Sequence, residues 1–265
     1  MAVIREHQRV QLWILILAGV FHTFDQWRRT LLPFLQWHIK PQPTFYSIGV
    51  LNSVGHFATL FGTPFAAQLI DSNGCWESAL ILSLITAIHA IMVSEVTDFY
   101  IFGFLQCLLA ANQLPLLFDT MIGQSVADDE SDKMRAQLLM QLTIPQSIAY
   151  AAGPYFAIQV IFFFTSNLSA SMIGASLSFF ILTALIIYFV IPRNKFTRGP
   201  QHSYLPSITA YTEMLSNQNL RWSLLFLIFV AAPYACYEQV IRVALPVHHI
   251  FEPSSFLKLV STIFK

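Results

Sequence analysis

The spacing of apolar stretches constrains this chain more than any other feature of its sequence. Seven stretches approach the roughly 20 residues that a helix needs to cross a bilayer, and charged residues gather between them. They cover 10–35, 45–70, 78–96, 99–126, 136–164, 169–191 and 222–246. The sequence therefore predicts an all-α, polytopic transmembrane helix bundle of about seven spans, with the lipid bilayer as its solvent.

The composition excludes two broad classes of protein. Of the 265 residues, 55% are hydrophobic and only 11% are charged, whereas soluble chains carry about 25% charged residues. Fourteen basic and fourteen acidic side chains give zero net charge, and the longest run of basic residues is Arg28-Arg29. Because nucleic acid is bound through a basic surface, we expect neither a soluble domain nor a nucleic-acid partner.

No motif of enzymatic chemistry is found in the sequence. The eight His are dispersed apart from His248-His249, so no Cys/His spacing fits a metal site. A Gly-rich phosphate loop and a nucleophile elbow are also missing. We therefore predict no metal, no cofactor and no catalytic activity.

The spans and the polar segments between them predict three parts. Residues 1–191 form a six-helix transmembrane unit, 192–221 a cytoplasmic linker, and 222–265 a seventh helix followed by the start of another. The acidic segment 127–135 is expected to be a further solvated loop. These boundaries place most loop Lys and Arg residues on the side of the N-terminus, against Lys40 on the other side. Basic loops mark the cytoplasmic side, so the N-terminus is predicted to be cytoplasmic, in the plasma membrane or an intracellular vesicle.

A short internal repeat links the first and seventh stretches. Residues 25–33 read DQWRRTLLP and residues 238–246 read EQVIRVALP, which align without a gap. The acid, the Gln, the second Arg, the Leu and the Pro recur in both. The alignment places Asp25 opposite Glu238 and Arg29 opposite Arg242. A coincidence assisted by apolar composition is the alternative. A true repeat would make the seventh span the start of a second, parallel six-helix unit, as in a large class of secondary transporters.

Ionisable residues inside the spans are the main functional candidates, because a charge at the bilayer centre costs about 2.5–3.5 kcal/mol or more. The predicted substrate-binding or proton-binding residues are Asp119, Asp25, Arg29, Glu238, Arg242 and His22. His56 and His89 are weaker candidates, for which a hydrogen-bonded neutral imidazole is the simpler interpretation.

Two pairings of these charges are open. Local pairs would join Asp25 to Arg28 or Arg29, and Glu238 to Arg242, one turn along the helix. Crossed pairs would join Asp25 to Arg242 and Glu238 to Arg29. Asp119 has no cation within one turn. It is therefore expected to face a cavity and bind a cation or a proton.

Several motifs resemble those of the major facilitator superfamily. Leu69, Asp71 and Gly74 keep the register of the motif between its second and third spans. Gly153 and Pro154 match the antiporter motif of its fifth span. Leu114-Pro115 and the run 31–35 are most similar to the organic-cation-transporter-like branch, the solute carrier family 22 member 18 type.

The resemblance implies a secondary transporter that moves a small organic solute, cationic or amphiphilic, by alternating access, with proton exchange as one mode. It assigns Asp71, Gly74, Gly153 and Pro154 to conformational switching. Such transporters have twelve spans, so we expect a chain truncated after the seventh, unable to complete a transport cycle alone. The basic residues of the 2/3 loop are missing and Gly103 replaces the usual arginine of the fourth span. Both departures favour the alternative, a non-transporting membrane protein that acts through partners.

Overall fold

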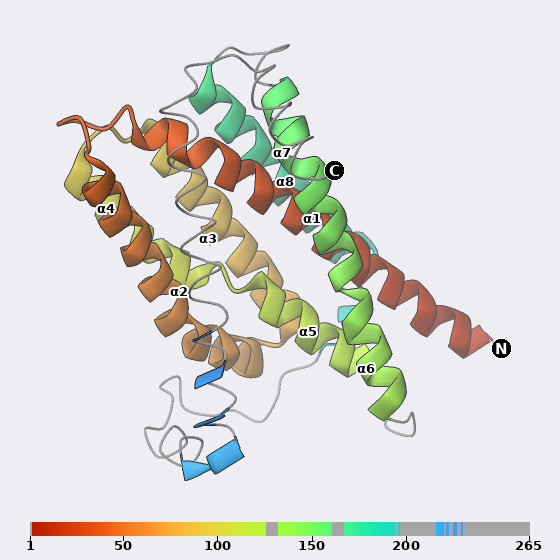
Figure 1. The fold of residues 1–265 in the computed structure, drawn as a ribbon. Helices are drawn as coiled ribbons and strands as arrows, with labels where there is room; N and C mark the ends of the chain where they lie inside the picture. Colours follow the sequence, from red (N-terminus) through yellow and green to blue (C-terminus); the bar gives the residue numbers. More distant parts are fainter. Residues whose placement is uncertain are drawn as a thin grey trace, which may run out of the picture. The chain divides into compact units, whose positions relative to one another are not determined.

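The computed structural model describes residues 2–125, 132–160, 167–193 and 196, with 216–219, 221–222, 225–226 and 229. The chain divides into two compact units, Met1–Tyr204 and Leu205–Lys265, and the named helices all belong to the first (Figure 1). They are α1 (Ala2–Gln36), α2 (Phe45–Asn73), α3 (Cys75–Glu95), α4 (Phe99–Gln106), the 3-10 helix η1 (Cys107–Ala111), α5 (Leu114–Ser125), α6 (Asp132–Gln141), α7 (Thr143–Val160) and α8 (Leu168–Phe189).

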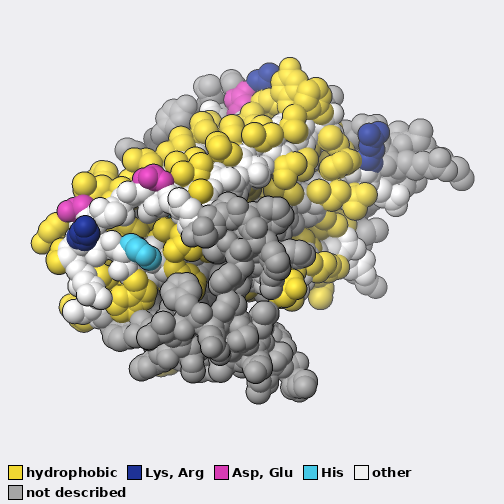
Figure 2. Space-filling model, turned by 90° about the horizontal axis from the view of Figure 1, so that it is seen from above, with side chains coloured by type: hydrophobic (Ala, Val, Ile, Leu, Met, Phe, Trp, Pro, Cys, Tyr) yellow, Lys and Arg dark blue, Asp and Glu magenta, His cyan; other side chains and the backbone are white. Residues whose placement is uncertain are grey.

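Three of these segments are long and apolar enough to cross a membrane: Cys75–Glu95, Phe99–Ser125 and Leu168–Phe189. The face shown in Figure 2 is covered mainly by apolar side chains where it is described, with few charged ones. Exposed aromatic side chains include Phe57, Phe61 and Phe104, at 62%, 66% and 73% exposure. The helical class is thus confirmed and three helices could span a membrane, while the full set of seven spans stays a prediction. Most of the stretch 222–246 lies outside the described residues.

Local sequence signals set the helix boundaries. Thr44 caps α2 through a capping box with Ser47, Asp98 accepts hydrogen bonds from the first amides of α4, and Asn167 does the same for α8. These side chains satisfy amides that have no partner inside the helix. Gly74, between α2 and α3, has a φ of 82°, a conformation that favours glycine.

Two predicted spans are interrupted. The stretch 99–126 consists of α4, η1 and α5, and the ordinary helix ladder gives way to tighter turns at Asn112 and Gln113, just before Pro115. The stretch 136–164 is divided at Leu142 into α6 and α7, and Pro145 follows in the first turn of α7, where its missing N–H is tolerated. The loop predicted at 127–135 is shorter than expected, because α6 already begins at Asp132.

The helices of the first unit pack around α1. This helix contacts α7, α8 and α5, while α3 packs on α8 and α2 packs on η1. Figure 1 shows α1 (red) running beside α7 (green). The contact with α7 is close at Gly153, where an added Cβ would lie 2.6 Å from Cβ of Gln26. A small residue there lets the two helix backbones approach.

Candidate functional site

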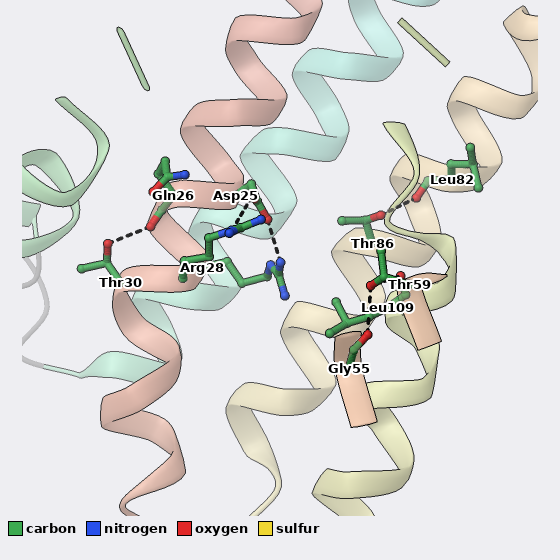
Figure 3. A network of polar contacts seen from close by, with 10 residues as sticks. Asp25, Gln26, Arg28, Thr30, Gly55, Thr59, Leu82, Thr86 and Leu109 are labelled. Atoms are coloured by element: carbon green, nitrogen blue, oxygen red, sulfur yellow. Dashed lines mark hydrogen bonds and ion pairs between the residues drawn. The ribbon is translucent and has the colours of Figure 1, made fainter. Parts of the chain in front are cut away.

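A cluster of charged side chains, two of them buried, lies in the C-terminal half of α1. Asp25 and Arg28 are each only 5% exposed. Arg28 donates from Nη2 to Oδ1 of Asp25 at 2.7 Å, and Arg29 donates from Nε to Oδ2 at 2.6 Å (Figure 3). One carboxylate therefore binds two guanidinium groups, and we call Asp25, Arg28 and Arg29 the α1 ionic cluster.

Helix geometry explains how the cluster forms. Residues three and four positions apart lie on one helix face, so Asp25 reaches Arg28 and Arg29 without help from another helix. Charge-assisted hydrogen bonds of this kind are about twice as strong as neutral ones. The local pairing is thus what the structure shows for Asp25. Glu238 and Arg242 lie outside the described residues, so the crossed pairs stay a prediction.

Several buried nitrogen atoms on α1 and α3 have no hydrogen-bond partner among the described residues. They are Nε of Arg28, Nε1 of Trp27, and both ring nitrogens of His89. His89 lies on α3 and is 1% exposed, and the charge of Arg28 acts on its ring. Because polar groups are costly to bury without partners, these atoms make this stretch a candidate site.

Aromatic rings line the same stretch of α1. Phe24 stacks on Phe179 of α8 with ring centroids 4.4 Å apart, and Phe21 meets Phe118 of α5 edge-on at 5.9 Å. The half-buried ring of His22 lies against Phe21 at 5.2 Å, and the charges of Asp25 and Arg29 act on it. The structure thus brings His22, Asp25 and Arg29 of the predicted site together.

The other predicted site residues lie apart from this cluster. Asp119 is exposed on α5, and its carboxylate has no hydrogen bond or ion pair with any described residue. Asp71 is exposed in the last turn of α2, next to the Gly74 turn. Helix α7 continues through Pro154 to Val160, and Gly153 serves the contact with α1.

Sequence reasoning missed a polar contact between α2 and the break after η1. Gln113 donates from Nε2 to the carbonyl oxygen of Thr59 at 2.6 Å and accepts from Oγ1 of Thr63 at 3.2 Å. Thr59 bonds in turn to the carbonyl oxygens of Gly55 and Leu109 (Figure 3). The sequence did hold a signal for this contact. Thr59 and Thr63 lie four residues apart in an apolar stretch, and residues 112–115 read Asn-Gln-Leu-Pro.

The end of α8 contacts the start of α3, next to the turn at Gly74. The indole of Trp76 donates to the carbonyl oxygen of Ile187 at 3.0 Å. Arg193 forms an ion pair with Glu77 and lies 5.2 Å from the centre of the Trp76 ring. These contacts hold the end of α8 against the start of α3.

Comparisons with protein-family models and with curated proteins found no match for this chain. The membership of the major facilitator superfamily therefore stays a prediction.

Proposed function

We propose that this chain is all or part of a secondary active transporter that moves a small amphiphilic organic solute by alternating access. The observation that carries the proposal is the α1 ionic cluster, in which Asp25 and Arg28 are buried within an apolar helix bundle. Ionisable groups inside a membrane are costly and mark solute or proton pathways.

The cluster has the properties of a site whose partners can change. Asp25 is shared between two guanidinium groups, and Arg29 is partly exposed, at 37% of its side chain. A solute that bonds to one guanidinium could replace the carboxylate there while the other guanidinium keeps Asp25 paired. Such differential contacts are what allow a ligand to shift a conformational equilibrium.

The break between η1 and α5 also supports transport. Non-helical backbone at membrane depth is tolerated where protein covers it or where it lines a cavity, and interrupted helices are common at transporter sites. Here Gln113, at the break, donates to the carbonyl oxygen of Thr59 on α2. This interruption therefore favours a transporter over a non-transporting membrane protein.

Counterflow into proteoliposomes and equilibrium binding together test the proposal. Two permanently charged solutes of similar size, benzenesulfonate and phenyltrimethylammonium, avoid passive leakage. We expect residues 1–265 to bind one of them saturably without counterflow, because the site of such transporters lies between two halves. Counterflow by this chain alone would instead indicate a site completed by a second copy. Neither binding nor counterflow by folded protein would favour a non-transporting membrane protein that acts through partners.

A further inference from the structure

Helices α3 and α8 form an antiparallel pair that is joined at both ends. At one end, Nε1 of Trp76 donates to the carbonyl oxygen of Ile187 at 3.0 Å. At the other end, Oγ of Ser169 donates to the carboxylate of Glu95. The start of each helix therefore lies beside the end of the other, and the two helices cover the same depth.

The length and composition of this pair match the hydrocarbon core of a bilayer. Helix α3 has 21 residues and α8 has 22, which at about 1.5 Å per residue is about 30 Å, the thickness of that core. The only Asp, Glu, Lys or Arg residues of α3 are Glu77 and Glu95, near its two ends, and α8 has none. Charge is thus confined to the levels at which the hydrocarbon would stop.

The surface of the pair is inverted relative to that of a water-soluble protein. Every exposed residue of α3 between Glu77 and Glu95 is apolar, whereas the Ser, Thr and His residues of this stretch are all buried. On α8, Ser178 and Tyr188 are the only exposed residues with a hydroxyl group. The large exposed aliphatic side chains are Ile81, Leu84, Ile88 and Met92 on α3, with Leu177, Ile181, Leu182 and Leu185 on α8. A continuous apolar surface of this kind is typical of contact with a membrane or another protein.

Aromatic and charged residues lie at both ends of the pair. At one end, the ring of the exposed Tyr188 lies 6.4 Å from the half-buried ring of Trp76. At the other end, the exposed Lys40 forms a β-bridge with Asp98, and the side chain of Tyr100 is 81% exposed. Trp and Tyr are enriched where hydrocarbon meets the headgroups. The two ends therefore have the composition of two membrane interfaces, which favours acyl chains over a second protein as the cover of the surface between them.

The α1 ionic cluster lies halfway between these two ends. Phe24, next to Asp25, stacks on Phe179 with ring centroids 4.4 Å apart, and Phe179 is in the middle of α8. The amide of Lys40 donates to the carbonyl oxygen of Thr97 at 2.6 Å, so α1 ends at the level where α3 ends. Helix α1 continues for 11 residues beyond Asp25, or about 16 Å, which is about half the thickness of the hydrocarbon core.

We infer that the exposed faces of α3 and α8 are covered by the acyl chains of a lipid bilayer, with Trp76 and Tyr100 at its two interfaces and Asp25 near its centre. Helix α1 then crosses the membrane beside α8, with Asp25 and Arg28 buried inside the bundle. The inference does not depend on the proposed transport.

The first test measures the depth of spin labels in phosphatidylcholine liposomes. In a background without native cysteines, a nitroxide is attached at Leu84→Cys and Ile181→Cys, near the middle of α3 and α8, and at the exposed control Arg9→Cys on α1. The ratio of collisions with oxygen to collisions with a polar nickel chelate should be at least about tenfold higher at the two central sites, because a polar chelate loses its hydrogen bonds to water in hydrocarbon.

Labels at Ile81→Cys and Met92→Cys, nearer the ends of α3, should give intermediate ratios. Nickel collisions as frequent at Leu84→Cys as at Arg9→Cys would show that the face is in water. Few collisions with either reagent, together with dipolar broadening between labels, would show that a second copy of the chain covers the face. Either result would overturn the inference, and each label reports separately, so a variant that fails to fold leaves the others to decide.

The second test measures the depth of the α1 ionic cluster through Trp27, which is half-buried and two residues from Asp25. Chains that keep only Trp27 or only Trp76, with Phe in place of the other tryptophans, are reconstituted with lipids brominated near the headgroup or near the chain ends. Bromine near the chain ends should quench the emission of Trp27 more, and bromine near the headgroup should quench that of Trp76 more. The same preference at both tryptophans, or the reverse order, would overturn the position of Asp25 near the centre. This depth profile without binding of either charged solute would refute the proposed transport and leave the inference standing.

Discussion

At the residue scale, the arrangement of charges along α1 was partly predictable. The spacing of Asp25, Arg28 and Arg29 guarantees that a local pair can form on any helix. What the spacing left open was whether Asp25 would instead pair with Arg242 of the repeat. The structure shows that Asp25 already bonds to two local cations, so a crossed pair would have to displace one of them.

Asp119 places an ionisable carboxyl group on the exposed face of an apolar helix. Its carboxylate is exposed within a segment that is apolar enough to span a membrane, where a charge is costly. We expect it to carry a proton there and to react with the apolar reagent dicyclohexylcarbodiimide, whereas Asp25 should be protected by its two guanidinium groups. Mass spectrometry of the labelled chain measures this difference.

The Asp119→Asn variant should lose that labelling. The matched control is Gly123→Ala one turn along α5, because an added Cβ there meets nothing within 4 Å. Labelling concentrated on Asp25, or equal labelling of the Asn variant, would show that Asp119 is not a proton-binding residue.

At the element scale, the contact between α2 and η1 depends on small residues. An added Cβ at Gly62 would meet the backbone of Ala110, with its Cα at 2.5 Å, and one at Gly55 would lie 2.7 Å from Cδ1 of Leu109. Backbone atoms cannot move aside as the end of a flexible side chain can. The two glycines therefore determine how closely the interrupted span can approach α2.

Gly62→Ala should lower the free energy of unfolding by about 1–3 kcal/mol, the usual cost of overpacking. Gly49→Ala on the same helix is the control, because an added Cβ there meets nothing within 4 Å. It should be neutral or stabilise by up to about 1 kcal/mol through helix propensity. Thermal unfolding in detergent, followed by circular dichroism, compares the two variants. Equal stability of both would show that η1 does not lie against α2 at Gly62.

At the scale of the whole molecule, the open question is how many helices cross the membrane. Helices occupy all six stretches predicted before residue 192, but three segments meet the length and composition of a span. Helix α1 differs from these three because it carries more charged residues, which include the α1 ionic cluster. Burial of these groups inside the bundle makes their insertion possible.

Cysteine labelling tests whether α1 crosses the membrane, as six spans in this part of the chain require. In a background without native cysteines, single cysteines replace Arg9 and Lys40, which are both exposed at opposite ends of α1. Six spans place the two positions on opposite sides of the membrane, so a membrane-impermeant maleimide should label only Lys40→Cys in intact cells. Labelling of both or of neither would contradict a transmembrane α1.

The sequence by itself determined the helical class and the positions of most helices, because each follows from neighbours along the chain. Apolar stretches, caps such as Asp98, and three- and four-residue spacings are local properties. Only the tertiary structure could decide which helices pack together, that Asp25 pairs locally, and that Gln113 bonds to Thr59 of α2. These features depend on residues far apart in the sequence, such as Thr59 and Gln113, at a separation of 54. Their contacts form only when whole helices meet, and no local propensity encodes that meeting.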